Sequence, residues 1–301
     1  MKRNNSVLKL AGVLLVVGLA LYFVGMAAFA SDAPAQGGNV TELTYEPADY
    51  TTPAVEITEI RIRTRNMPVK VTPSKGSEIT LHYYTCEKDP YEVSLDGGVL
   101  TLKYKYDNLF NVSSWFNGST IFNVINNTNP RVEVVVPEAY AGALELDTSN
   151  ASVNVSDLTA AGDIRIDTSN SPIELNNVSA VQVSAHTSNG AVTLSKLIVS
   201  GTVDMKSSNG SLTARQVAAK DKLRLDTSNG RIVVDQVTSA NIELRSSNGG
   251  ISGTVGGKRS DYTISSDTSN ADDNLGDGGK GPFRLTVNTS NGAINISFTD
   301  E

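Results

Sequence analysis

The sequence is short of cysteine, and it lacks basic clusters and any recognisable catalytic constellation. Its one thiol, Cys86, excludes an intrachain disulfide in this chain of 301 residues, and a lone cysteine is most often a small buried residue. Lys and Arg cluster at most in pairs and the formal net charge is −7, which argues against a nucleic-acid partner because phosphate binding needs a basic surface. No set of acids, bases or nucleophiles marks an active site. We therefore expect a non-enzymatic protein with no cofactor and no metal.

Aromatic residues are also scarce, at 6% against 39% hydrophobic residues overall, so the core must be built from small, mostly β-branched side chains. What the chain does contain is a repeat. The tripeptide Thr-Ser-Asn or Ser-Ser-Asn occurs eight times, ending at Asn150, Asn170, Asn189, Asn209, Asn229, Asn248, Asn270 and Asn291. By subtraction, the successive spacings are 20, 19, 20, 20, 19, 22 and 21 residues. A near-constant period of this length indicates a solenoid.

Each repeat has the pattern of two short strands that meet at a bend. Apolar residues stand six and four positions before the Asn and three and five positions after it, as Leu144, Leu146, Val153 and Val155 do around Asn150. Polar residues alternate with them, which is the period of half-buried strands. We predict an all-β, single-stranded β-solenoid, similar to a β-helix, with rungs of about 20 residues. The stacked asparagines are expected to hydrogen-bond from rung to rung.

Glycine follows the Asn at five of the eight bends: Gly190, Gly210, Gly230, Gly249 and Gly292. Because glycine is the residue that most readily adopts a positive φ, we predict such a conformation at these bends.

The column directly before the tripeptide changes sign along the repeats, so we interpret it as solvated surface. It includes Asp147 and Asp167, and carboxylates one rung apart are spaced about as in a retaining glycosidase. A β-helix polysaccharide-active enzyme is therefore the alternative function. The tripeptide threonines also form a ladder, which raises ice binding as a third hypothesis, although Ser207 and Ser246 interrupt it.

The N-terminus carries a second strong signal. Lys2, Arg3 and Lys9 precede an uncharged apolar run over residues 10–30, which as a helix would be about 31 Å long, enough to cross a bilayer core. The positive flank predicts a single-pass membrane anchor with the N-terminus inside and the body extracytoplasmic. The alternative is a secreted protein, since Ala28 and Ala30 fit a signal-peptidase site with cleavage following Ala30.

The domain organisation follows from these patterns. Residues 1–30 are expected to be the anchor or signal peptide, and residues 31–54, rich in Pro and Gly, an extended linker. Residues 55–137 alternate without the tripeptide and are expected to form an irregular β head continuous with the solenoid. Residues 138–301 are expected to form eight rungs.

Two segments interrupt the pattern. Residues 105–130 hold Phe110, Trp115, Phe116 and Phe122, which are candidate partner contacts, the alternative being a cap over the end of the solenoid. Residues 271–282 hold three aspartates and four glycines. Their spacing does not fit an EF-hand, so we interpret them as a solvated insertion.

The repeated Thr-Ser-Asn-Gly bends, the strand–bend–strand from Ile60 to Pro73 and the strand over residues 132–137 resemble the bacterial family of adhesin-like β-strand-repeat proteins. The resemblance covers residues 55–301. It implies a membrane-tethered, extracytoplasmic module that binds or scaffolds cell-envelope components, with a role in envelope stress in some members. The implied partners are the membrane through residues 10–30 and an envelope glycan or membrane protein. It supplies no catalytic residues.

Overall fold

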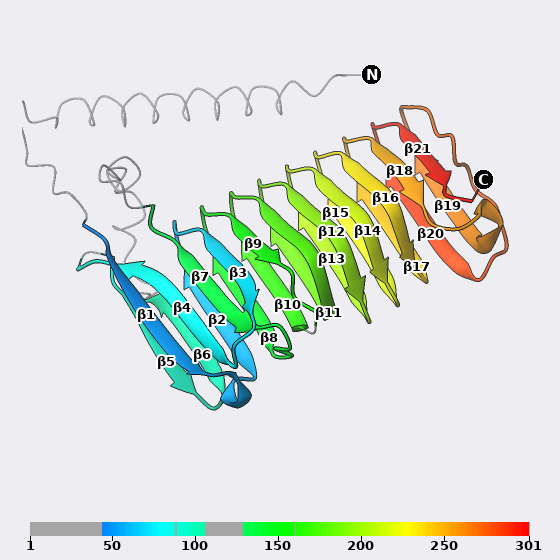
Figure 1. Cartoon of the computed structure of the whole chain (residues 1–301). Helices are drawn as coiled ribbons and strands as arrows, with labels where there is room; N and C mark the ends of the chain where they lie inside the picture. The colour runs from blue at the N-terminus through cyan, green and yellow to red at the C-terminus, as the bar shows by residue number, and fades with distance from the viewer. Residues whose placement is uncertain (1–43, 88, 106–128, 160, 301) are drawn as a thin grey trace, which may run out of the picture. The chain divides into compact units, whose positions relative to one another are not determined.

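The repeat folds into the rungs of a β-solenoid, which confirms the predicted all-β class (Figure 1). The computed structural model describes residues 44–87, 89–105, 129–159 and 161–300. The chain forms two units, Met1–Glu42 and Leu43–Glu301, and all described residues belong to the second. In those ranges no helix is long and apolar enough to cross a membrane. The predicted anchor at residues 10–30 lies outside them.

The elements fall into three groups along the chain. The first group is β1 (Glu46–Pro53), the short helix η1 (Ala54–Glu56), β2 (Glu59–Thr64), β3 (Val69–Ser74), β4 (Glu78–Thr85), β5 (Tyr91–Asp96), β6 (Val99–Tyr104) and β7 (Val132–Pro137). The second is β8 (Ala143–Thr148), β9 (Val153–Ser156), β10 (Ala161–Thr168), β11 (Ile173–Thr187), β12 (Val192–Val199), β13 (Thr202–Ser207), β14 (Leu212–Ala219), β15 (Lys222–Thr227), β16 (Ile232–Ser239), β17 (Asn241–Ser246) and β18 (Ile251–Val255). The third is η4 (Arg259–Asp261), β19 (Tyr262–Thr268), β20 (Phe283–Thr289) and β21 (Ile294–Phe298).

Equivalent strands stack in parallel and in register. The strand before each bend forms a first wall, in which β8, β10, the end of β11, β13, β15 and β17 follow one another. The strand after each bend forms a second wall, and its continuation beyond a further turn forms a short third wall. The sequence predicts columns of apolar residues before and after each Asn, and these side chains point inward. They are at most 4% exposed. Ser266, Asp273 and Gly253 occupy three positions of the columns without an apolar side chain. They make one continuous core.

The bend asparagines form a ladder of side-chain hydrogen bonds. Each Nδ2 donates to the Oδ1 of the Asn on the neighbouring rung, at 3.0 Å for the first pair and 2.7 Å for the others. The spatial order is Asn66, Asn150, Asn170, Asn189, Asn209, Asn229, Asn248, Asn291 and Asn270. Asn66, between β2 and β3, therefore continues the ladder beyond the eight tripeptides.

The prediction of positive φ at the bend glycines is wrong. None of the five has a positive φ. The glycines are needed because the backbones stack closely: a Cβ on Gly210 would lie 1.7 Å from the carbonyl oxygen of Gly190, and one on Gly190 would lie 2.0 Å from that of Ser171. Positive φ occurs instead at the second turn, seven residues after the Asn, at Asp157, Asn177, Lys196, Gln216 and Gln236.

The N-terminal end corrects the predicted linker. Residues 46–53, assigned to the linker 31–54, form β1, which pairs antiparallel with β4 along its whole length. Its Tyr and Thr residues favour strands, and its prolines, Pro47 and Pro53, lie near its two ends, where a missing N–H donor is tolerated. The head is continuous with the solenoid, because β2 pairs with β8 and β3 with β9, while β6 and β7 extend the two walls.

At the C-terminal end the rungs do not follow chain order. β20 and β21 stack on β17 and β18, and β19 pairs with the far side of β20. The rung of Asn270 is therefore outermost, and it is the rung with Ser266 and Asp273 in the apolar columns. Residues 271–282 cover its open edge: the backbone of Gly278 pairs with Ile264 in both directions, at 2.7 and 3.1 Å. Leu275, which belongs to this segment, is buried.

Candidate functional site

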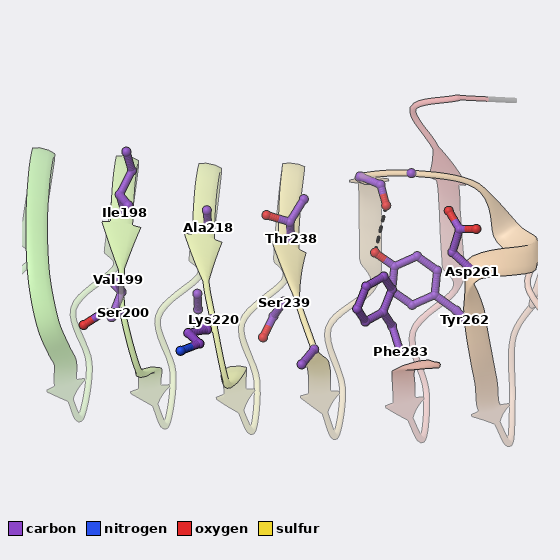
Figure 2. Close-up of a pocket in the computed structure, with 14 residues that line it drawn as sticks. Ile198, Val199, Ser200, Ala218, Lys220, Thr238, Ser239, Asp261, Tyr262 and Phe283 are labelled. Carbon is purple, nitrogen blue, oxygen red and sulfur yellow. Dashed lines mark hydrogen bonds between the residues drawn. The ribbon is translucent and has the colours of Figure 1, made fainter. Parts of the chain in front are cut away.

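A groove of about 540 Å³ runs along the third wall near the C-terminal end of the solenoid (Figure 2). Its floor crosses successive rungs, because Ile198, Ala218 and Thr238 are paired in register and all point outward. Further along, Gly256 extends the floor, and a Cβ there would lie 2.4 Å from Thr238 Cγ2. The small outward side chains of neighbouring rungs therefore leave a depression in the surface of the third wall.

Large apolar side chains are exposed along this wall. Of the five large apolar residues in the described part that are exposed, Ile198 (67%) and Phe283 (42%) line the groove. Ile198 is exposed because it stands between two inward residues, Leu197 and Val199, in a strand that alternates. Concentration of exposed apolar surface at a concave site is typical of a binding surface.

An aromatic cluster closes one end of the groove. The ring of Tyr262 lies 5.7 Å from that of Phe283 and 5.6 Å from that of Phe298, measured between centroids. Its hydroxyl donates to the carbonyl oxygen of Gly256 at 2.8 Å (Figure 2). Burial, with a smaller effect from the nearby Asp261, raises the pKa of Tyr262, so the phenol stays protonated and keeps this hydrogen bond.

Two charged residues line the groove. Lys220 is exposed at its rim, and no ion pair of its ammonium group is present within the described part of the chain. Asp261 lies toward the aromatic end, where its Oδ2 accepts a hydrogen bond from the Lys258 backbone N–H at 2.9 Å. The positive charge at the rim is therefore available to a ligand.

The outward side of the first wall is charged instead of apolar. Lys222 pairs with Glu243 at 2.6 Å, and Arg61 with Glu145 at 2.8 Å. His186 lies between Asp167 (3.5 Å) and Asp204 (3.3 Å).

These two carboxylates raise the pKa of His186 to about 9. Burial opposes ionisation of Asp204, but hydrogen bonds from His186 and Lys206 lower its pKa to about 2. The charges on this wall are thus largely neutralised by one another.

Comparison with known protein families decides the family. A family model described as Toastrack DUF4097 matches residues 57–301. The chain belongs to the Toastrack family. This confirms the resemblance inferred from the repeated bends.

Solved structures are similar to this chain. A candidate lipid-binding protein from Parabacteroides distasonis is similar with a TM-score of 0.50 and 13% identity, over 84% of this chain and 97% of that one. A candidate adhesin from Parabacteroides merdae has a TM-score of 0.48 and 12% identity, over 84% of this chain and 96% of that one. At such identities the likeness shows the fold alone. No curated protein matches the chain.

The charges around Asp167 bear on the alternative of a polysaccharide-active enzyme. Asp147 and Asp167 are neighbours in register on the first wall. A glycosidase acid needs a raised pKa, whereas the hydrogen bond from His186 and the charge of Arg165, 2.8 Å away, lower the pKa of Asp167. Asp167 is therefore unsuited to be the acid of such a pair.

The threonine ladder proposed for ice binding points into the molecule. Thr148 is 1% exposed and Thr227 2%. Their equivalents hold the bends together: Thr187 Oγ1 accepts from the Gly190 N–H at 3.1 Å, and Thr227 Oγ1 donates to the Gly210 carbonyl at 3.1 Å. A buried ladder presents no surface to ice, so this hypothesis is wrong.

The remaining predicted sites have different outcomes. Residues 106–128, with Phe110, Trp115, Phe116 and Phe122, lie outside the described residues, so their contact role stays a prediction. In the segment 271–282, Asp273 accepts from the Leu275 N–H at 2.8 Å and Asp277 from the Ser266 N–H at 2.8 Å; these carboxylates hold the cap in place. Cys86 is only half-buried. Across the residues that the structure describes, no three His, Cys, Asp or Glu side chains are grouped to hold a metal ion.

Sequence reasoning missed the groove. The signal was the uninterrupted apolar run Leu197, Ile198 and Val199, where a half-buried strand should carry a polar residue in the middle.

Proposed function

We propose that this Toastrack protein is a non-enzymatic, adhesin-like module that binds an apolar component of the cell envelope through the groove on its third wall. The observation that carries the proposal is the groove itself. It exposes Ile198 and Phe283 to solvent, although Ile198 could be polar without loss of the inward core. Exposed apolar residues around a built concavity are typical of binding surfaces, whereas scattered ones are not.

The proposed location of the module is the outer side of the membrane, held by residues 10–30 with the N-terminus inside. Secretion after cleavage following Ala30 is the alternative. A mass measurement of the mature N-terminus distinguishes them: an intact N-terminus in the membrane fraction supports the anchor, and a chain starting at Ser31 contradicts it.

The groove is tested by removing its exposed apolar side chains. Ile198→Ser and Phe283→Ser should each lower the fraction of the chain that co-sediments with isolated envelope fragments severalfold, because each removes apolar contact area at the site. Val55→Ser is the matched control, since Val55 is 91% exposed and lies outside the groove. Equal loss in the control, or no loss in the groove variants, would contradict this function.

A second contact is proposed at residues 105–130, through Phe110, Trp115, Phe116 and Phe122. Deleting residues 106–128 should weaken envelope association and leave the β signature in circular dichroism unchanged. Unchanged association would remove the segment from the binding surface. A role in envelope stress would be supported by induction of the gene under cell-wall damage.

A further inference from the structure

The rim of the groove carries a cation whose counter-charge is absent from the described chain. On the first wall, Lys206 and Lys222 each contact a carboxylate, at 2.9 and 2.6 Å. Lys220 lines the groove beside Ser200 and Ala240 instead, and no carboxylate of the described residues lies within ion-pairing distance of it. A positive charge beside an apolar trough matches a ligand with a negative end and an apolar body.

The shape of the groove favours a linear ligand. Its floor is one outward column that passes from Ile198 to Gly256 in three rung steps, roughly 14 Å at about 4.8 Å per step. A helix about 10 Å across is wider than this single column of small side chains, so it would lie on the wall and not in the trough. An added β-strand is excluded as well, since the floor strands β14 and β16 already pair on both sides and offer no free edge.

The charges also define an orientation. Asp261 lies toward the aromatic end and would repel a second negative group there. A negative end is therefore favoured at Lys220, while Tyr262 and Phe283 offer apolar surface to the remainder of the ligand.

We infer that the groove binds a free fatty acid, with its carboxylate paired to Lys220 Nζ and its hydrocarbon chain lying over Ala218 and Thr238 toward Tyr262 and Phe283. The inference rests on the proposed function, because it names the apolar component that the groove takes. Hydrocarbon burial supplies most of the affinity, and the ion pair selects an acid over an alcohol or an ester of the same chain.

The test uses the full-length chain and a fatty acid that carries a photoreactive diazirine on the chain. After irradiation, the labelled peptides are identified by mass spectrometry. Label should concentrate on peptides that contain residues 218–220, 238–240 and 256–262. A diazirine fatty alcohol of equal length and a phospholipid with the same labelled chain are the comparison probes, and both should label these peptides about tenfold less at the same low probe concentration.

Matched variants distinguish the contribution of the Lys220 charge from that of the apolar floor of the groove. Lys220→Gln should reduce fatty-acid labelling about tenfold, whereas Lys196→Gln should not. Lys196→Gln is a close control, because it removes a nearby exposed lysine and installs the residue found at the equivalent turns, Gln216 and Gln236. Ala218→Phe should abolish labelling by filling the floor, and Thr213→Phe, an outward residue of the same strand on the second wall, should not.

Several results would overturn the inference: label spread over the whole surface, equal labelling by the alcohol or the phospholipid, or no effect of Lys220→Gln. Failures of the two proposals are distinguishable. If Ile198→Ser reduces envelope binding but the fatty acid labels nothing, the fatty-acid ligand is wrong and the binding module stands. If the fatty acid labels the groove and Ile198→Ser leaves envelope binding intact, the ligand stands and the adhesin-like role is wrong.

Discussion

At the scale of single residues, the asparagine ladder has a direction. Every Asn of the ladder after Asn66 donates its Nδ2 to the rung on its N-terminal side in space, so an interior residue such as Asn209 both donates to Asn189 and accepts from Asn229. Asn66 accepts from Asn150, and it donates to no other member of the ladder. The same substitution should therefore have different effects along the column.

Asn209→Asp should destabilise the protein by about 1 kcal/mol, because a carboxylate cannot donate to Asn189 and places two acceptors face to face. Asn66→Asp should be nearly neutral, because the acceptor role survives. Urea denaturation followed by circular dichroism measures both. Equal midpoints for the two variants would show that the ladder has no directional role.

The first-wall charges predict a pH dependence centred on His186. Its pKa is raised to about 9 in the folded chain, so its stabilising contribution is complete below the unfolded value of about 6.5 and is lost as the pH rises through 9. His186→Gln should lower stability by about 1 kcal/mol or less near pH 6, after allowance for solvent screening, and by progressively less toward pH 10. Thermal melts of the variant and the unchanged protein across this range check the prediction. A difference in stability between His186→Gln and the unchanged protein that grows as the pH rises would contradict a raised pKa at His186.

At the scale of elements, the bend glycines act through rung spacing. Gly210→Ala places a Cβ 1.7 Å from the Gly190 carbonyl oxygen, so the two rungs must separate or shift, at a cost of about 1–3 kcal/mol. Gly76→Ala is the matched control. Its nearest contact would be at 3.6 Å and its φ is not positive, so stability should change by less than about 0.5 kcal/mol. The denaturant midpoints of the two variants measure the difference. An unchanged midpoint for Gly210→Ala would show that the bend accommodates a Cβ atom, as it does at Ala151 and Ser171.

The elements also show how far the sequence could predict the structure. The period of 19 to 22 residues and the apolar columns were sufficient for strands, rungs and core, because these depend on local alternation. A glycine that recurs in a repeat, however, indicates only that a Cβ atom is disfavoured at that position. It does not distinguish a left-handed φ from a close backbone contact, and at Gly210 the structure shows the close contact without a positive φ. The groove escaped prediction because it depends on outward residues of different rungs, which no single repeat displays.

At the scale of the whole molecule, spatial order differs from chain order at the C-terminal end. A repeat spacing is one-dimensional and implies that successive rungs are neighbours. Here Ser266 and Asp273 make the rung of Asn270 a poor partner on both sides, so it becomes the outer rung, and the more apolar strands β20 and β21 occupy the interior. The cap formed by residues 271–282 then covers an edge that would otherwise be open to association.

This order predicts an unusual response to truncation. Removing residues 283–301 deletes an interior rung, so β19 loses its pairing with β20 and the cap loses its contacts with Ile294 and Ile296. Backbone amides of Ile264 and its neighbours in β19 should then exchange with deuterium at rates near those of an unfolded chain, while those of β13 to β15 stay protected. If the rungs stacked in chain order, β19 would remain paired to β17 and its amides would stay protected in the truncated protein. Hydrogen exchange read by mass spectrometry on the two chains therefore distinguishes the interleaved end from a simple stack, because only the interleaved end makes β19 depend on strands that follow it.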